Sequence, residues 1–140
     1  MSQDPALAIN DQAFISFVAA CEQCVGDSGD TIATRDAVAA LAAQLASHWH
    51  MPDPAFRQLQ AGAPYSSYQL YLNRQQSLSV ILDIFAPGQV APVHNHCCWG
   101  VFVCLEGAEL ERCYTVAEDL STPPAQAQVR HNGPGVISVA

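Results

Sequence analysis

The chain has 140 residues, of which half are apolar and 13% are charged, a composition typical of one globular domain rather than a disordered chain. Its net charge is -8 and its five basic residues are scattered arginines, which excludes a basic patch for nucleic acid. No apolar run is long enough to span a membrane, and the N-terminus lacks the layout of a secretory signal. We therefore expect a soluble, cytoplasmic protein with neither nucleic-acid nor membrane partners.

The first sixty residues predict helices. Apolar residues recur at helical spacing from Phe14 to Val25, after Asn10 and Asp11 as candidate caps, and a break follows at Gly26–Asp30. A second helix is expected from near Thr34 to Trp49, where the sequence MPDP stops it, and a short helical piece follows at Ala55–Leu59. We expect residues 1–60 to form an N-terminal helical segment.

The first of these helices contains Cys21-x-x-Cys24. No second CxxC pair accompanies it, and no strand leads into it. Two ordinary helix cysteines are the favoured interpretation, and a redox or metal role is the alternative.

The period changes to alternation in the second half of the chain, which predicts strands. The expected strands are 68–72, 78–84, 93–105, 110–114 and 136–139. Glu106 and Gly107 are expected to form a hairpin turn, and Ser121–Gln128 reads as a polar loop. Helices followed by successive hairpins suggest a helical cap on an antiparallel barrel or sandwich, with the barrel over residues 61–140.

Two histidines, His94 and His96, stand near the start of the predicted strand 93–105. On a strand, residues i and i+2 project from the same face, so both imidazoles can reach one metal ion while Asn95 points away. The alternative is that each histidine is a hydrogen-bonded core or rim residue. The pair therefore makes His94 and His96 the candidate metal ligands.

Other residues of the same chemistry have plainer interpretations. His48 and His50 at a helix end would splay apart, and His131 is expected in a solvated loop. We expect small core residues at Cys97 and Cys98, core or pocket-wall aromatics at Trp99 and Phe102, and a solvated or hydrogen-bonding carboxylate at Glu109.

The spacing around the histidines resembles the first motif of the cupin superfamily, G-x5-H-x-H-x3-E-x6-G. The fixed points are Gly88, His94, His96 and Gly107, with Gly100 where the motif has Glu. The longer stretch PGQVAPVHNHCCWG is similar to the PG-x4-PVHDH-x2-WG segment of the bacterial thiol dioxygenases, the family of cysteine dioxygenase and 3-mercaptopropionate dioxygenase. The resemblance implies a mainly β fold, a cupin double-stranded β-helix (jelly-roll barrel) preceded by helices.

The same resemblance implies an activity. Three histidines would hold a non-haem Fe(II), and a small thiol such as cysteine or 3-mercaptopropionate would be oxidised by O2 to its sulfinate. Neutral imidazoles leave the iron its full charge, which favours a bound thiolate. The small thiol and O2 are thus the expected partners.

The sequence departs from that family in three places. Asn95 replaces the Asp of the motif, and Leu70 stands where cysteine dioxygenases carry a substrate-binding Arg. The third histidine is expected beyond Ala140, so the last strands of the barrel would be missing and their open edges could favour a homo-oligomer. The alternative function is a non-catalytic or degenerate cupin-like metal-binding domain.

Overall fold

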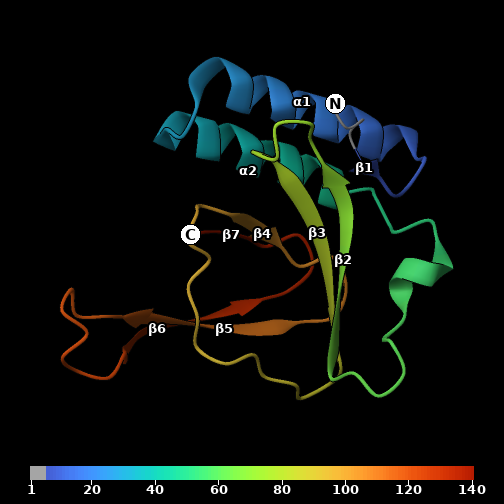
Figure 1. Ribbon diagram of the computed structural model, residues 1–140. Helices are drawn as coiled ribbons and strands as arrows, with labels where there is room; N and C mark the ends of the chain where they lie inside the picture. Colours follow the sequence, from blue (N-terminus) through green and yellow to red (C-terminus); the bar gives the residue numbers. More distant parts are fainter. Residues whose placement is uncertain (1–5) are drawn as a thin grey trace.

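The structure is a computed structural model that describes residues 6–140; residues 1–5, the start of the predicted helical segment, lie outside the described part. A two-residue strand, β1 (Ala6–Leu7), is followed by α1 (Gln12–Ser28), α2 (Ile32–Ala46) and the short 3-10 helix η1 (Pro54–Arg57) (Figure 1). The predicted helices are confirmed within one to three residues. Strand β1 is the one element of this segment that the pattern missed.

One carboxylate organises the start of the helical layer. Asp11 Oδ1 accepts the backbone N–H of Phe14 at 2.9 Å and the indole N–H of Trp49 at 2.7 Å. Asp11 therefore caps α1 and ties it to the chain that leaves α2. Helix α1 continues through Gly26 and ends at Gly29, whose φ of 62° suits a residue without a side chain.

Three small antiparallel sheets follow the helices. Their strands are β2 (Tyr65–Leu72), β3 (Ser79–Phe85), β4 (Val101–Val103), β5 (Glu109–Thr115), β6 (Ala125–Asn132) and β7 (Ile137–Val139). The sheets have the orders β1-β2-β3, β4-β7 and β5-β6. Two helices followed by small sheets make the fold mixed α/β rather than the expected mainly β, and no closed barrel forms among residues 6–140.

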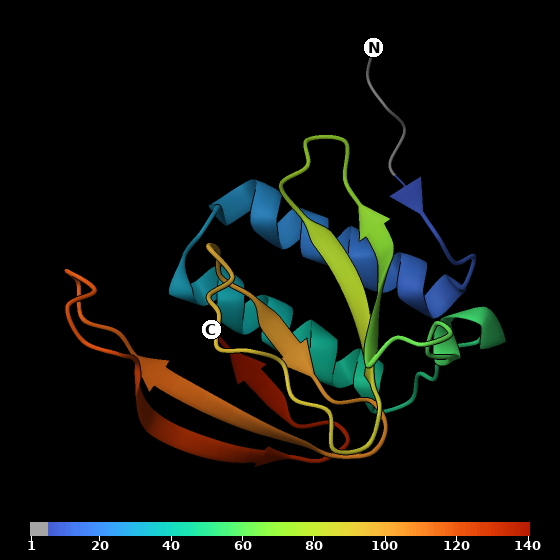
Figure 2. The same cartoon turned by 60° about the horizontal axis from the view of Figure 1, so that its bottom comes forward.

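The elements form layers (Figures 1 and 2). Helices α1 and α2 lie side by side, and α2 packs on β4 and β7, while the β5–β6 sheet lies on the far side of that pair. The long β2–β3 hairpin runs past the helices at one end of the layers. No helix in the described part of the chain is long and apolar enough to cross a membrane.

Strand pairing differs from the expected chain of hairpins. The predicted strand 93–105 is irregular as far as Gly100, and β4 pairs with β7, with Val101 opposite Val139. Glu106 and Gly107 therefore form a turn between two sheets, not a hairpin turn. Strand β6 replaces the expected polar loop at 121–128, because its pairing with β5 outweighs the weak β-propensity of its first residues.

The main core joins the helices to the β2–β3 hairpin. A register shift between Gln69 and Tyr71 lets two successive residues, Leu70 and Tyr71, both face inward. They pack with Ile9, Phe14, Val18, Trp49 and Met51. This cluster draws on both predicted segments, 1–60 and 61–140, so the two are packed together around one core.

Candidate metal and ligand site

The histidine pair lies on the long connection 86–100 between β3 and β4, not on a strand as expected. His94 and His96 are both exposed. Their rings nevertheless lie side by side, with centroids 4.9 Å apart and planes at 17°. The two rings are thus stacked on each other without a strand, on a type of long loop that is often functional.

A backbone carbonyl orients the first imidazole. His94 Nδ1–H donates to the carbonyl oxygen of Pro92 at 2.6 Å. With the proton on Nδ1, the lone pair of Nε2 is available to a metal ion, and such an outer hydrogen bond is the usual support of a ligating histidine. The pair therefore fits the nitrogen donors of a transition-metal site.

An aromatic ring supports the second imidazole and explains the departure from the cupin motif. Phe102 meets His96 edge to face, with ring centroids 5.0 Å apart at 89°. The same ring occupies the space beside Gly100, where an added Cβ would lie 2.9 Å from Phe102 Cζ. A carboxylate at position 100, as in the motif, is incompatible with this position of Phe102.

The third ligand is not assembled. Among residues 6–140, no group of three or more His, Cys, Asp or Glu side chains is close enough to hold a metal ion. His131 lies on β6, opposite Leu110, rather than in the expected loop, and it is exposed. His48 and His50 are exposed on either side of the buried Trp49. A metal ion at this place would have two protein ligands in the conformation described.

The two cysteines after the histidines are exposed, so the expectation that they are small core residues is wrong. Cys97 has a φ of 57°, and both its backbone N–H and its thiol donate to Asn95 Oδ1, at 3.1 and 2.8 Å. Asn95 therefore holds the bend of the loop at Cys97. Its role is local and structural.

The start of α2 contacts the end of the loop. The guanidinium carbon of Arg35 lies 5.7 Å from the centre of the Trp99 ring, and Arg35 also pairs with Asp30 at 2.8 Å. Trp99 is half-buried. The end of the loop is thus anchored on helix α2 through Trp99.

A polar network continues inward from the sheet that carries Phe102. Ser138, the cross-strand partner of Phe102, donates to Glu111 at 2.9 Å and accepts from Arg130 at 2.9 Å. Asn132 donates to Glu109 at 3.0 Å, which confirms a hydrogen-bonding role for that carboxylate, and to Glu111 at 3.3 Å. The network ties the β5–β6 sheet to β4–β7. Sequence analysis missed it, although its members alternate along β5 and β6.

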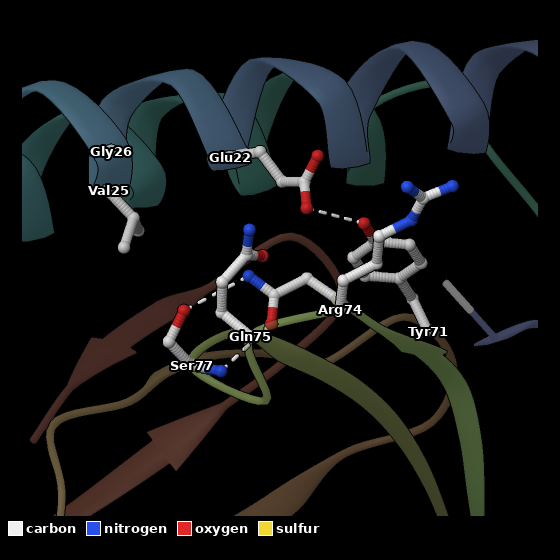
Figure 3. A pocket seen from close by; sticks show the side chains of 8 residues that line it. Glu22, Val25, Gly26, Tyr71, Arg74, Gln75 and Ser77 are labelled. Atoms are coloured by element: carbon white, nitrogen blue, oxygen red, sulfur yellow. Dashed lines mark hydrogen bonds between the residues drawn. The ribbon is translucent and has the colours of Figure 1, made fainter. Parts of the chain in front are cut away.

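A hollow lies between α1 and the turn of the β2–β3 hairpin (Figure 3). It has a volume of about 710 Å³ and is lined by Glu22, Tyr71, Arg74 and Gln75, among others. Tyr71 donates to Glu22 at 2.6 Å, and burial, followed by this hydrogen bond, raises the pKa of Tyr71 to about 12. No predicted site residue lines this cleft.

The paired cysteines of α1 fit the structural interpretation. Both are free thiols, and Cys21 is fully buried. Burial, and then the neighbouring Cys24, raises the pKa of the Cys21 thiol to about 12. A thiol that stays protonated is a poor nucleophile and a poor metal ligand.

A comparison with known families matches residues 70–133 to the family model described as Auxin binding protein. The matched region runs from the end of β2 to the end of β6 and contains the histidine pair, Gly100 and Phe102. No solved structure matches the chain. The match covers less than half of the 140 residues, so we state it as a similarity of this region.

This match corrects the assignment made from the motif. The resemblance to the thiol dioxygenases is wrong, and with it the expected iron-dependent oxidoreductase activity and the partners, a small thiol and O2. The His-x-His spacing alone does not specify a chemistry, because one fold carries many functions and the site decides. Leu70, where a substrate-binding Arg was sought, lies in the core and cannot contact a ligand in the loop.

Proposed function

We propose that this chain is a non-catalytic, cupin-like domain that binds a small aromatic carboxylic acid of the auxin type through a metal ion on His94 and His96. The similarity of residues 70–133 to the auxin-binding family supports the ligand class. The geometry that carries the proposal is the side-by-side histidine pair, with His94 held by the Pro92 carbonyl. The β-rich residues 61–140 would be the cupin-like part of such a domain, covered by helices α1 and α2.

In this proposal the metal ion supplies the positive charge that binds the carboxylate of the ligand. The chain carries a net charge of -8, so its overall field disfavours an anionic ligand. When bound by two neutral imidazoles, a divalent ion keeps its full charge and has positions open to a carboxylate oxygen. Imidazole suits both Zn²⁺ and Fe(II), and Fe(II) remains our proposal for the resident ion.

The surroundings suit the ring of such a ligand. Phe102 and Trp99 offer aromatic surfaces close to the histidines along the chain. Arg35 lies over Trp99 and adds one positive charge at the start of α2, although Asp30 neutralises part of it. The site thus combines a point of positive charge with an apolar aromatic wall.

The test is binding of indole-3-acetic acid by isothermal titration calorimetry, on the full chain with and without Zn²⁺ or, under anaerobic conditions, Fe(II). We expect binding to require the metal and to weaken about 100-fold or more in His94→Gln/His96→Gln, beyond the loss typical of an outer-shell partner. The second His-x-His of the chain supplies a matched control, because His48→Gln/His50→Gln should bind as the unaltered chain does.

A neutral ligand sharpens the result. Indole-3-acetamide has the same ring but no carboxylate, so we expect it to bind more weakly. Binding that is independent of metal, or equal for the acid and the amide, would overturn the proposed role of the ion.

A further inference from the structure

Among residues 6–140, the hollow between α1 and the turn of the β2–β3 hairpin shares no lining residue with the loop 86–100, which carries the histidines (Figure 3). Its volume of about 710 Å³ is in the range of pockets that hold small organic molecules, roughly 300–1,000 Å³. Its lining brings a carboxylate and a guanidinium together with amide and hydroxyl groups and the apolar side chain of Val25. This hollow is therefore a candidate ligand site of its own.

We propose that the hollow binds a small zwitterion, a molecule with one ammonium and one carboxylate group, such as a free amino acid or a dipeptide. Glu22 would accept the ammonium, Arg74 would bind the carboxylate, and Val25 would contact an apolar side chain of the ligand. The proposal is independent of the metal and ligand site on His94 and His96, so either can fail without the other.

The negative end of the hollow is Glu22, whose carboxylate is held in place by a buried phenol. Tyr71 is 5% exposed and donates its hydroxyl proton to Glu22 Oε1 at 2.6 Å. The second carboxylate oxygen has no hydrogen bond within residues 6–140, so it can accept an ammonium N–H. The net charge of -8 also favours the approach of a positively charged group.

The positive end is Arg74, on the turn that follows β2. Its side chain reaches toward α1 beside Tyr71 (Figure 3). Burial and the bond to Glu22 raise the pKa of Tyr71 to about 12, and the nearby guanidinium of Arg74 opposes that rise, so both charges act on the same hydroxyl group. A guanidinium has five N–H donors in a planar fork, so Arg74 can bind a ligand carboxylate alongside a protein partner.

Hydrogen bonds from one buried amide hold the turn that carries the positive end. Asn73 is 8% exposed, and its Oδ1 accepts the backbone N–H of Ser77 at 2.8 Å and that of Leu78 at 3.1 Å. Its Nδ2 donates to Ser77 Oγ at 3.0 Å. The backbone positions of Arg74 and Gln75 are thus fixed before a ligand arrives, which lowers the cost of ordering them on binding.

The amide of Gln75 completes the lining. It points toward α1 in Figure 3, and no hydrogen bond to this side chain is found within the described part of the chain. An amide both donates and accepts, so Gln75 can bind either charged group of a zwitterion. The hollow also disfavours ligands with a single charge, because a lone anion would meet Glu22 and a lone cation would meet Arg74.

The test is isothermal titration calorimetry of the full chain with L-leucine and with glycyl-L-leucine, which represent the free amino acid and the dipeptide. We expect saturable binding of at least one, and the tighter of the two identifies the source of the zwitterion. N-acetylation of the tighter ligand removes its ammonium and amidation removes its carboxylate, so each derivative should bind about tenfold or more weakly. Saturation by neither zwitterion, or equal binding of the derivatives, would overturn the proposal.

A variant at the negative end has a matched control. Glu22→Gln keeps an oxygen for the Tyr71 hydroxyl but loses the charge, so the affinity for the tighter zwitterion should fall about tenfold or more. Glu118→Gln makes the same change of net charge at an exposed residue outside the lining, and the affinity should stay within about twofold. Equal affinities in the two variants would contradict the role of Glu22.

The turn offers a second pair of variants, which decides the question if circular dichroism shows that Glu22→Gln does not fold. Gln75→Ala should weaken binding about fivefold, whereas Gln76→Ala, next to it but outside the lining, should bind as the unaltered chain does. His94→Gln/His96→Gln should also bind the zwitterion unchanged. Loss of binding in that variant would place the zwitterion on the histidine loop and overturn the proposal.

Discussion

The core beneath the helices is buried and closely packed, whereas the loop that carries the histidines is exposed to solvent. In the core, Phe14 is 1% exposed and stacks on Trp49, with ring centroids 5.7 Å apart at 25°. On the loop, His94, Asn95, His96 and both cysteines are exposed, and short-range contacts hold them. Stability therefore resides in one region and candidate chemistry in the other, which leaves the loop free to change conformation without unfolding the domain.

Removing the central ring of the core gives the largest effect. We expect Phe14→Ala to lower the free energy of unfolding by about 3–5 kcal/mol, because it leaves a cavity beneath both helices. Val93→Ala, at a loop residue that is 55% exposed, should cost less than about 0.5 kcal/mol. Urea denaturation measures both, and comparable losses at the two sites would break the contrast.

The next effect concerns the carboxylate that serves both helices. Asp11→Ala removes the cap of α1 and leaves the indole N–H of Trp49 without its acceptor, for which we expect a loss of about 2 kcal/mol. Asp53 is the matched control, since it caps only the exposed η1. Thermal unfolding should show Asp53→Ala to be the milder change, by about 1 kcal/mol or more.

Position 100 lies where the two regions meet. Gly100→Ala places a Cβ 2.9 Å from Phe102 Cζ, so we expect a loss of about 1–2 kcal/mol and a displaced Phe102 ring. Gly133→Ala, where an added Cβ meets nothing within 4 Å, should cost less than about 0.5 kcal/mol. The chemical shifts of the His96 ring protons report on the ring, and they should move only in the first variant.

The polar network between the sheets should give a comparable or smaller loss. Ser138 is 4% exposed and bonds to both Glu111 and Arg130, so Ser138→Ala is expected to cost about 1–1.5 kcal/mol. Ser67 donates to Asp83 on an exposed face, so the control variant Ser67→Ala should lose about 0.5 kcal/mol of unfolding free energy or less. Equal losses in urea denaturation would show that the network adds nothing through burial.

The last prediction concerns a titration in the core rather than a loss of packing. Because the pKa of folded Tyr71 is raised to about 12, above its ordinary value near 10, the neutral phenol contributes stability below about pH 10. That contribution is lost as the pH rises through the interval between the two values. In an ultraviolet titration, Tyr71→Phe should remove the step near pH 12, whereas Tyr65→Phe should leave that step in place.

The helical half of the fold could be predicted because its signals are local. The period from Phe14 to Val25 and the cap at Asp11 depend on neighbours within one or two turns. The inward turn of both Leu70 and Tyr71 could not be predicted, because a bulge follows from pairing with β3 rather than from the residues themselves. Strand β6 was missed for the same reason, since its register with β5 lies outside any local window.

At the candidate site, too, local spacing could be predicted but contacts that depend on the path of the chain could not. The pairing of His94 with His96 was visible in their spacing, and the rings do lie together. The support from the Pro92 carbonyl and from Phe102 depends on the path of an irregular loop, which no period describes. The motif also suggested a reaction, and there it failed, because residues 70–133 match the model of another family, described as Auxin binding protein.

The pairing of β4 with β7 has a consequence for the order in which the protein forms. During synthesis, Val101 of β4 can pair only after Val139 of β7 has been made. Strands β2 and β3 are joined by a short turn and can pair as soon as both have been made. Strand β4 therefore has no pairing strand on this edge until residues 137–139 emerge from the ribosome. We expect this segment to depend on chaperones more than the β2–β3 hairpin does. Slowing translation between residues 104 and 136 should lengthen that exposure and lower the soluble yield.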